Sequence, residues 1–183
     1  MKSSLFIHHT DDPSTKPQFQ KVYDYHNRGA PRDDGTRKWP PGHGMQYHFF
    51  IESFGELWKG KDQDKTAWHS NDPYWNDNAL AVCLAGDFTH GDPTDQQLAT
   101  LYNLWKSLSY PKIMLHKDVR DTECPGTFPF KSELRARYLL DLRNRLATAT
   151  KALVRFVGTV RGNMLKRLTE RLRKLIAEED HSE

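Results

Sequence analysis

Short apolar runs separated by polar segments predict strands in the first part of the chain. Residues 79–88 (ALAVCLAGDF) and 112–116 (KIMLH) are almost continuously apolar, as expected for strands of a sheet covered on both faces. Residues 4–8 (SLFIH) form a third short run that ends in polar residues. Residues 46–61 (QYHFFIESFGELWKGK) predict a strand, a turn around Gly55 and a second strand, which together make a hairpin.

Other segments repeat their apolar residues at the spacing of an α-helix. Residues 17–28 (PQFQKVYDYHNR) follow this spacing, with Pro17 suited to the first helical turn and Gly29 suited to the stop. A second helix is predicted to begin at residues 93–95 (Pro-Thr-Asp), because leucines recur at helical spacing after it. A third helix is predicted from about Lys131.

The remaining segments follow neither period. Residues 30–45, rich in Pro, Gly, Asp and Arg, and residues 67–79 (AWHSNDPYWNDNA) are predicted loops. The predicted order β-α-β-β-β-α-β-α indicates an α/β fold with a mixed central β-sheet flanked by helices. His8 and His116 both stand at the ends of predicted strands, which is where ligands collect in such sheets.

The C-terminal part of the chain shows a different pattern. Residues 142–178 are predicted to form a basic amphipathic helix, and we divide the chain into a main domain at residues 1–141 and a helical segment at 142–183. Gly158 and Gly162 each cost about 1 kcal/mol inside a helix and mark either a bend or a close helix contact. The apolar stripe recurs every three or four residues and consists of Leu142, Leu146, Ala149, Leu153, Phe156, Val160, Met164, Leu168, Leu172 and Leu175.

The formal net charge of +3 hides an asymmetry between these two parts. Residues 144–175 contain nine Lys and Arg and a single acid, whereas residues 176–183 contain four acids. The basic helix can contact an anionic membrane or lipopolysaccharide, or bury its stripe on the main domain or on another copy of the chain. Nucleic acid is the least favoured partner, because no aromatic residues interleave the charges and no nucleic-acid-binding motif is present.

The composition narrows the class of protein further. A hydrophobic fraction of 37% suits a globular protein. The sequence contains no run of about 18 apolar residues, so no transmembrane helix is predicted. The first residues lack the apolar core of a signal peptide, so we expect synthesis in the host cytoplasm. Cys83 lies in an apolar run and is expected in a core, whereas Cys124 lies in the polar loop DTECPG.

His116 and Cys124 are eight positions apart, across a loop that continues with Pro125 and Gly126. Imidazole nitrogen and thiolate sulfur are ligands that zinc prefers, and a catalytic zinc site uses three protein ligands and leaves one position for water. The pair alone is weak evidence for a metal site, because a His and a Cys often lie this close by chance.

Six segments together carry a resemblance to a known family. They are IHHT (7–10), YHFFIESFGELWKGK (47–61), AWHS (67–70), NDNALAVCLAGDFT (76–89), PTDQQLATL (93–101) and HKDVRDTECPG (116–126). Over about residues 5–130 the chain resembles the type 2 N-acetylmuramoyl-L-alanine amidases, which include peptidoglycan recognition proteins and the amidase endolysins of bacteriophages. The resemblance implies Zn²⁺ bound by His8, His116 and Cys124. It also implies hydrolysis of the amide between N-acetylmuramic acid and L-alanine in peptidoglycan.

The resemblance also implies roles for residues near the metal. Tyr47 occupies the position of a tyrosine near the zinc-bound water, and Thr122 that of a threonine found in recognition proteins with amidase activity. Both hydroxyls could stabilise an oxyanion, an interaction worth about 3 kcal/mol when well placed. Members with a substituted cysteine generally bind peptidoglycan without cutting it, and a branch used in cell-wall recycling has Asp there. With Cys124 the chain resembles the cysteine branch, which implies a complete set of three ligands.

The substrate is expected to contact His69, Trp68 and Asn76, which lie in and after the AWHS segment. His9 and His48 follow His8 and Tyr47 directly, so they are expected on the opposite side of their strands in supporting positions.

The activity that the resemblance implies is that of a phage-type endolysin, which reaches the cell wall after release from the cytoplasm. Two alternatives remain open. One is a peptidoglycan-binding protein without catalysis, and the other is a membrane-active protein in which the cationic helix is the effector.

Overall fold

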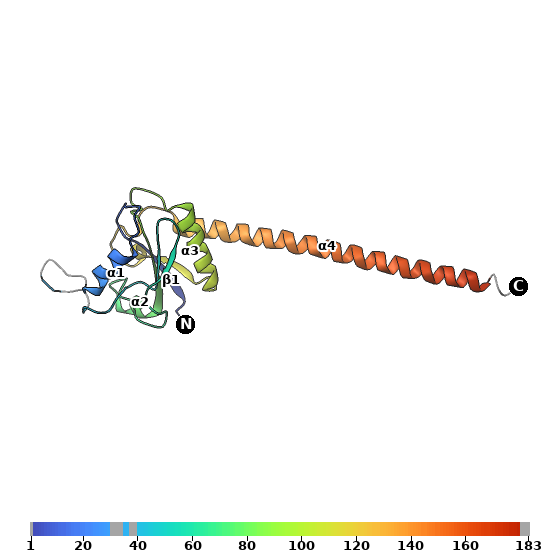
Figure 1. The fold of residues 1–183 in the computed structure, drawn as a ribbon, viewed down its shortest axis with the longest axis horizontal. Coiled ribbons are helices and arrows are strands. Elements are labelled where there is room, and N and C mark those ends of the chain that lie inside the picture. Colours follow the sequence, from blue (N-terminus) through green and yellow to red (C-terminus); the bar gives the residue numbers. More distant parts are fainter. Residues whose placement is uncertain (1, 30–34, 37–39, 180–183) are drawn as a thin grey trace. The chain divides into compact units, whose positions relative to one another are not determined.

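The computed structural model describes residues 2–29, 35–36 and 40–179 (Figure 1). The chain divides into two compact units, Met1–Leu134 and Arg135–Glu183. The predicted division at residue 142 rests on the change of sequence pattern and stays a prediction.

Five strands in the described part of the first unit form one mixed sheet with the order β3-β2-β4-β1-β5. They are β1 (Ser4–His9), β2 (Phe49–Ile51), β3 (Leu57–Lys59), β4 (Ala79–Leu84) and β5 (Lys112–Leu115). β1, β2, β4 and β5 run parallel, and β3 is antiparallel to β2. The central strands β1 and β4 are buried along their whole length, which explains their almost continuously apolar sequences.

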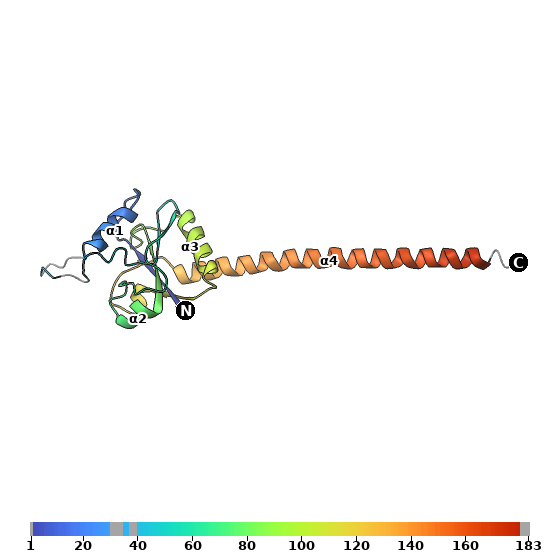
Figure 2. The ribbon, with the colours of Figure 1, turned by 60° about the horizontal axis from the view of Figure 1, so that its bottom comes forward.

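Helices cover both faces of this sheet (Figures 1 and 2). The helices are α1 (Phe19–Asn27), α2 (Pro73–Asn78), α3 (Asp95–Ser107), the 3-10 helix η1 (His116–Asp118) and α4 (Phe130–Glu179), whose first residues belong to the first unit. On one face of the sheet, Leu5 and Ile7 pack in a core with Leu101 of α3 and Phe130 of α4.

The other face of the sheet carries His8. Phe50 and Cys83 pack there with Phe19 of α1, and Phe6 packs with Trp75 of α2. The burial of Cys83 confirms its predicted place in a core. Because side chains alternate along β1, His8 lies on the same face as Phe6, whereas His9 lies on the face of α3.

The first residues of α3 and α1 show when the start of a helix can be predicted from the local sequence. α3 begins where predicted, because the Thr94 hydroxyl accepts a hydrogen bond from the Gln97 N–H at 3.1 Å. α1 begins at Phe19, two residues later than predicted. The reason is distant in the sequence: the Glu52 carboxylate accepts hydrogen bonds from the N–H groups of Gln18 and Phe19, at 2.9 and 2.8 Å.

The predicted loop at residues 67–79 is wrong in part, because it contains α2. The Asp72 carboxylate accepts a hydrogen bond from the Tyr74 N–H at 2.8 Å, and Pro73 occupies the first turn. α2 has no buried residue, so it lacks the apolar stripe that would have predicted it. In the predicted loop at 30–45, residues 30–34 and 37–39 lie outside the described residues.

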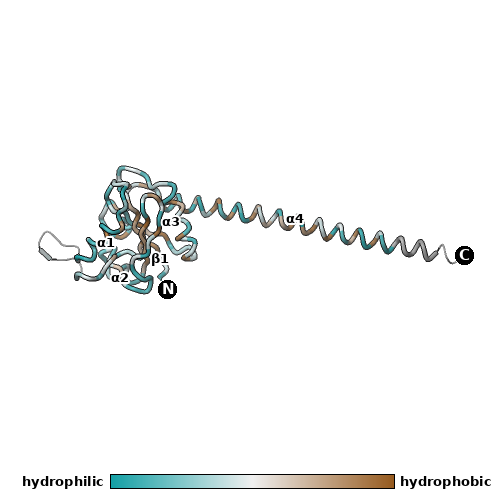
Figure 3. The backbone as a smooth tube through the Cα atoms, viewed as in Figure 1, coloured by the Kyte–Doolittle hydropathy of each residue, from teal (hydrophilic) through white to brown (hydrophobic). Residues whose placement is uncertain are grey.

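α4 continues without interruption through Gly158 and Gly162, and a Cβ added at either would meet nothing within 4 Å. Its apolar residues are exposed: Leu146, Leu153 and Phe156 have relative exposures of 70%, 62% and 66%. Figure 3 shows polar and apolar residues alternating along the helix. Among the described helices, none combines the length and hydropathy needed to cross a membrane. The predicted fold class, a mixed sheet flanked by helices with a C-terminal amphipathic helix, is confirmed.

Candidate metal centre and cleft

The pairing of β1 with β5 brings His8 and His116 together. Ile7 lies opposite Leu115 in the two parallel strands, so the next residues of each chain segment are His8 and His116. Their ring centroids are 4.6 Å apart. The loop between η1 and α4 adds Cys124, whose Sγ lies 3.7 Å from His8 Nδ1. One donor atom from each of the three residues lies within 4.8 Å of the others.

This donor set fits a zinc ion. Ligand atoms 2.0–2.3 Å from a tetrahedral ion are about 3.3–3.8 Å apart, close to the Cys124–His8 distance. Burial lowers the pKa of His8 well below its usual range, which keeps the imidazole in the neutral form that binds metals. Burial also raises the pKa of the Cys124 thiol to about 12. A thiolate at this position therefore needs a cation beside it, and two neutral imidazoles and one thiolate are ligands that zinc prefers.

The loop that carries Cys124 is fixed by backbone contacts. The Cys124 N–H donates to the Thr122 hydroxyl at 3.3 Å, and the Cys124 carbonyl accepts from the Lys117 N–H at 3.0 Å. Gly126 has a φ of +90°, and a Cβ there would lie 2.1 Å from the carbonyl group of Phe88. The Phe88 carbonyl in turn accepts from the Thr127 N–H at 2.8 Å. The close approach of these two segments therefore requires glycine at position 126.

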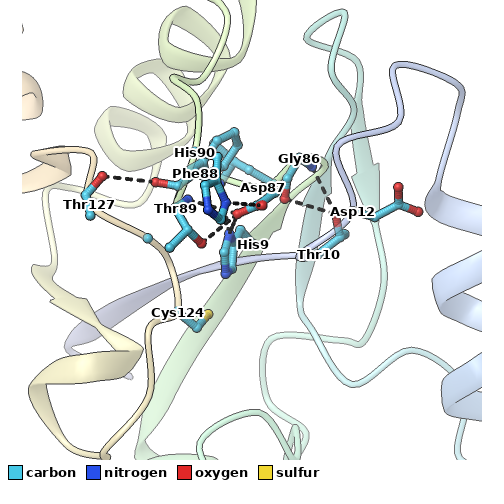
Figure 4. A network of polar contacts seen from close by, with 12 residues as sticks. His9, Thr10, Asp12, Gly86, Asp87, Phe88, Thr89, His90, Cys124 and Thr127 are labelled. Atoms are coloured by element: carbon cyan, nitrogen blue, oxygen red, sulfur yellow. Dashed lines mark hydrogen bonds and ion pairs between the residues drawn. The ribbon is translucent and has the colours of Figure 1, made fainter.

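His9 belongs to a separate network behind the three candidate ligands. Figure 4 shows His9 beside Asp87, Phe88 and His90, in a network that extends toward Cys124. His9 Nδ1 accepts from the Phe88 N–H at 3.1 Å. Hydrogen bonds from Thr89 and His90 hold the pKa of Asp87 well below its usual range. His9, Asp11 and Asp87 also bring donor atoms within 4.8 Å, but the Asp87 oxygens and His9 Nδ1 already accept these hydrogen bonds.

His69 contacts the candidate metal ligand His8 directly. Its Nδ1 lies 3.0 Å from His8 Nε2, while His8 Nδ1 faces Cys124. If Nδ1 of His8 binds the metal, its Nε2 carries the proton and donates it in a hydrogen bond to His69. Burial lowers the pKa of His69 to about 3, so His69 stays neutral and can accept that bond. The sequence predicted only a substrate contact for His69.

A cleft of about 820 Å³ opens beside the three donors. It brings together six of the residues that the sequence singled out: Tyr47, Trp68, His69, Asn76, His116 and Thr122. No role in a cleft was predicted from the sequence for the other residues of its wall, namely Tyr25, His26, Thr66, Asn71, Pro73, Asp77, Arg120 and Asp121. Arg120 and Asp121 lie in the segment between His116 and Cys124, so their position next to two candidate ligands was the available signal.

Tyr47 and Thr122 both line this cleft. The Tyr47 ring centroid is 5.2 Å from that of His8, and burial raises the pKa of Tyr47 well above its usual range. Tyr47 is therefore a protonated donor at neutral pH. The Thr122 oxygen accepts from the Cys124 N–H, which leaves its own proton to donate. Their catalytic roles stay predictions.

Asn76 and Trp68 shape the rim of the cleft. The side-chain oxygen of Asn76 accepts from the N–H groups of His69 and Ser70, both at 3.0 Å, so Asn76 holds the segment that carries His69. Trp68 is 37% exposed, and its ring stacks on His43 with centroids 5.9 Å apart. A substrate contact by either residue stays a prediction.

Comparisons with known proteins agree with this geometry. Residues 3–127 match the family model described as Amidase_2, N-acetylmuramoyl-L-alanine amidase. The chain therefore belongs to the N-acetylmuramoyl-L-alanine amidase family, whose members include enzymatic amidases.

The relatives include an endolysin and a peptidoglycan-recognition protein. An endolysin of Enterobacteria phage K11 is 35% identical over 102 residues, which are 49% of this chain and 66% of the endolysin. Peptidoglycan-recognition protein LB of Drosophila melanogaster is 33% identical over 87 residues, 44% of this chain and 37% of that protein. The chain thus spans less than two thirds of either relative.

Among solved structures, the amidase LysC from Clostridium intestinale URNW matches with a TM-score of 0.60 and 32% identity, covering 74% of this chain and 84% of LysC. Two recognition-protein structures that contain tracheal cytotoxin, at 20% and 22% identity, share the fold with TM-scores of 0.57 and 0.53.

Proposed function

We propose that this protein is a zinc-dependent N-acetylmuramoyl-L-alanine amidase, which hydrolyses the amide between N-acetylmuramic acid and L-alanine and serves as a phage-type endolysin in cell lysis. The observation that carries the proposal is the convergence of His8, His116 and Cys124 within 4.8 Å, beside a cleft of about 820 Å³. A cleft of this size accommodates a sugar with part of its stem peptide. Membership of the amidase family supports the same reaction.

In this proposal His8, His116 and Cys124 hold the zinc ion. When bound, zinc lowers the pKa of a coordinated water toward about 7 and supplies a hydroxide nucleophile at neutral pH. Tyr47 and Thr122 keep their protons and donate hydrogen bonds to the oxygen of the scissile carbonyl as negative charge develops on it. His69 holds the ring of His8 in one orientation through the 3.0 Å contact.

The rest of the cleft binds the muropeptide. Trp68 offers an aromatic face to a sugar ring or a stem peptide. Arg120, Asp77 and Asp121 supply charges along the same wall, suited to the carboxylates and amines of a stem peptide. The recognition proteins whose structures contain tracheal cytotoxin, a peptidoglycan fragment, support a ligand of this chemical class.

Digestion of purified cell walls tests the proposal. We expect the protein with zinc to release peptides with a free L-alanine amine, detected by mass spectrometry, together with about one zinc per chain. Cys124→Ala should lose the bound zinc and at least about a thousandfold in rate, because the nucleophile and the carbonyl polarisation depend on the metal. Cys83→Ala is the matched control for zinc content, since Cys83 is buried beside the site but outside the donor set.

The recognition-protein relative favours one alternative, a peptidoglycan-binding protein without catalysis. Cell walls that bind the zinc-loaded protein in a pull-down, yet yield no new alanine termini, would establish this alternative and exclude the amidase.

A further inference from the structure

The second unit exposes a continuous apolar stripe. In α4, the exposed members of the stripe between residues 142 and 168 are Leu142, Leu146, Leu153, Phe156, Val160, Met164 and Leu168. At 100° per residue their side chains fall within about 120° of the helix circumference. A stripe of this width is typical of a helix that buries one face against another surface.

Charge decides which kind of surface fits the stripe. Residues 142–168 contain seven Lys and Arg and neither Asp nor Glu. By helical spacing Arg143 and Arg161 border one edge of the stripe and Arg145 the other. Lys151, Arg155 and Lys166 lie on the opposite side, and Arg167 falls within the stripe near its C-terminal end, where its long side chain can still reach the surface. A second copy would bring seven more positive charges to the contact, and helices that pair with one another usually place acids opposite such bases. An anionic surface therefore fits better than a second copy.

The threonine hydroxyls of this helix already make hydrogen bonds within the helix. The hydroxyls of Thr148, Thr150, Thr159 and Thr169 each donate to the carbonyl four residues earlier, at 2.8–2.9 Å. Thr150 borders the stripe, so its hydroxyl would enter an apolar boundary with its hydrogen bond already made. This lowers the cost of desolvating it.

We propose that residues 142–168 bind the surface of a bilayer containing anionic phospholipid, with the apolar stripe against the acyl chains and the Lys and Arg residues at the phosphates. A helix with cations at the edges of an apolar face lies in the plane of such an interface. Nucleic acid would engage the charges and leave the stripe in water. The proposal does not depend on the zinc site.

The experiment mixes the full chain with vesicles made of equal parts phosphatidylglycerol and phosphatidylcholine, or of phosphatidylcholine alone, and measures the bound fraction by co-sedimentation. We expect binding to the anionic vesicles to be at least about tenfold stronger, because each cation near an anionic surface contributes separately. Added salt should weaken the binding, since it screens these charges.

Two variants with equal charge separate the stripe from the charge. Leu153→Glu places one negative charge within the stripe, and Asn144→Glu places one on the polar side. Leu153→Glu should weaken binding by more than about tenfold, because it removes a leucine that the bilayer would bury and adds a charge at the acyl chains. Asn144→Glu should weaken it by only about fivefold, the effect of one charge near the surface. Far-UV circular dichroism checks that both variants keep their helix.

Three results would overturn the proposal: absence of binding to anionic vesicles, equal binding to both kinds of vesicle, or an equal loss in the two variants. Sedimentation equilibrium without lipid adds a fourth. If the chain forms dimers or larger assemblies that Leu153→Glu dissociates and Asn144→Glu does not, a second copy covers the stripe and the proposal is wrong.

Discussion

Helices α3 and α4 carry similar apolar patterns but use them in opposite ways. In α3 the stripe is buried against the sheet, and Leu101 has no exposed surface. In α4 beyond Leu134 the apolar side chains are exposed, as at Leu153. An amphipathic pattern therefore predicts a helix and the face that will be covered, but it does not identify what covers that face.

Charge separates the two units as clearly as burial does. Residues 1–134 contain fifteen Lys and Arg against eighteen Asp and Glu, whereas residues 135–183 contain twelve against six. The positive charge of the whole chain thus belongs to the second unit. A patch of one sign concentrated on one segment favours a partner of the opposite sign, while the nearly balanced first unit leaves recognition to the shape and chemistry of its cleft.

The largest expected difference comes from removing a leucine from each helix. Leu101→Ala should destabilise the first unit by about 2–5 kcal/mol, because it leaves a cavity in the core. Leu153→Ala should change stability by less than about 0.5 kcal/mol, since Leu153 is exposed. All five tryptophans precede residue 106, so tryptophan fluorescence during urea unfolding reports the first unit. Equal effects of the two substitutions on that transition would refute the contrast.

Gly126 tests how tightly the metal loop is held. Gly126→Ala should destabilise the first unit by about 3 kcal/mol, because the new Cβ would lie 2.1 Å from the Phe88 carbonyl carbon and oxygen. The same clash displaces the loop that carries Cys124, so zinc affinity should fall in competition with a chelating dye. A variant that keeps both stability and zinc affinity would show that the two segments can separate freely.

The sequence predicted the fold best where local pattern and tertiary position agree. β1 and β4 were readable because strands in the middle of a sheet are apolar throughout, and α3 because Thr94 and Gln97 cap it locally. The start of α1 was missed by two residues, because its cap is Glu52, which follows β2 more than thirty residues later in the sequence. Such distant caps leave no local signal.

The site was predictable only with the family resemblance. His116 and Cys124 are close in sequence, but His8 joins them through the pairing of β1 with β5, and strand pairing over a hundred residues cannot be read from local spacing. The contact of His69 with His8 depends on the same tertiary arrangement. For this reason the structure, and not the sequence, is the basis for proposing that His69 orients His8.

His69 allows the metal-supporting residues to be separated from those that only line the cleft. His69→Ala should lower zinc affinity by about 10–100-fold, the usual effect of removing the hydrogen-bond partner of a metal ligand. Trp68→Ala should leave zinc affinity unchanged, because Trp68, the residue before His69, lines the cleft but lies outside the donor set. Chelator competition measures both. If the two variants bind zinc equally well, the His69–His8 contact has no role in holding the metal.

The smallest expected effect is that of Gly158→Ala in the second unit. Its effect on stability should have the opposite sign to that of Gly126→Ala in the first unit. Gly158 lies inside α4, and a Cβ there would meet nothing within 4 Å, in contrast to Gly126. Gly158→Ala should therefore stabilise the helix by about 0.5–1 kcal/mol, because alanine loses less backbone entropy on ordering. Far-UV ellipticity on heating should show a later loss of helix, while tryptophan fluorescence should show an unchanged first unit. A loss of helix stability instead would mean that Gly158 is a close-contact position whose neighbour a side chain displaces.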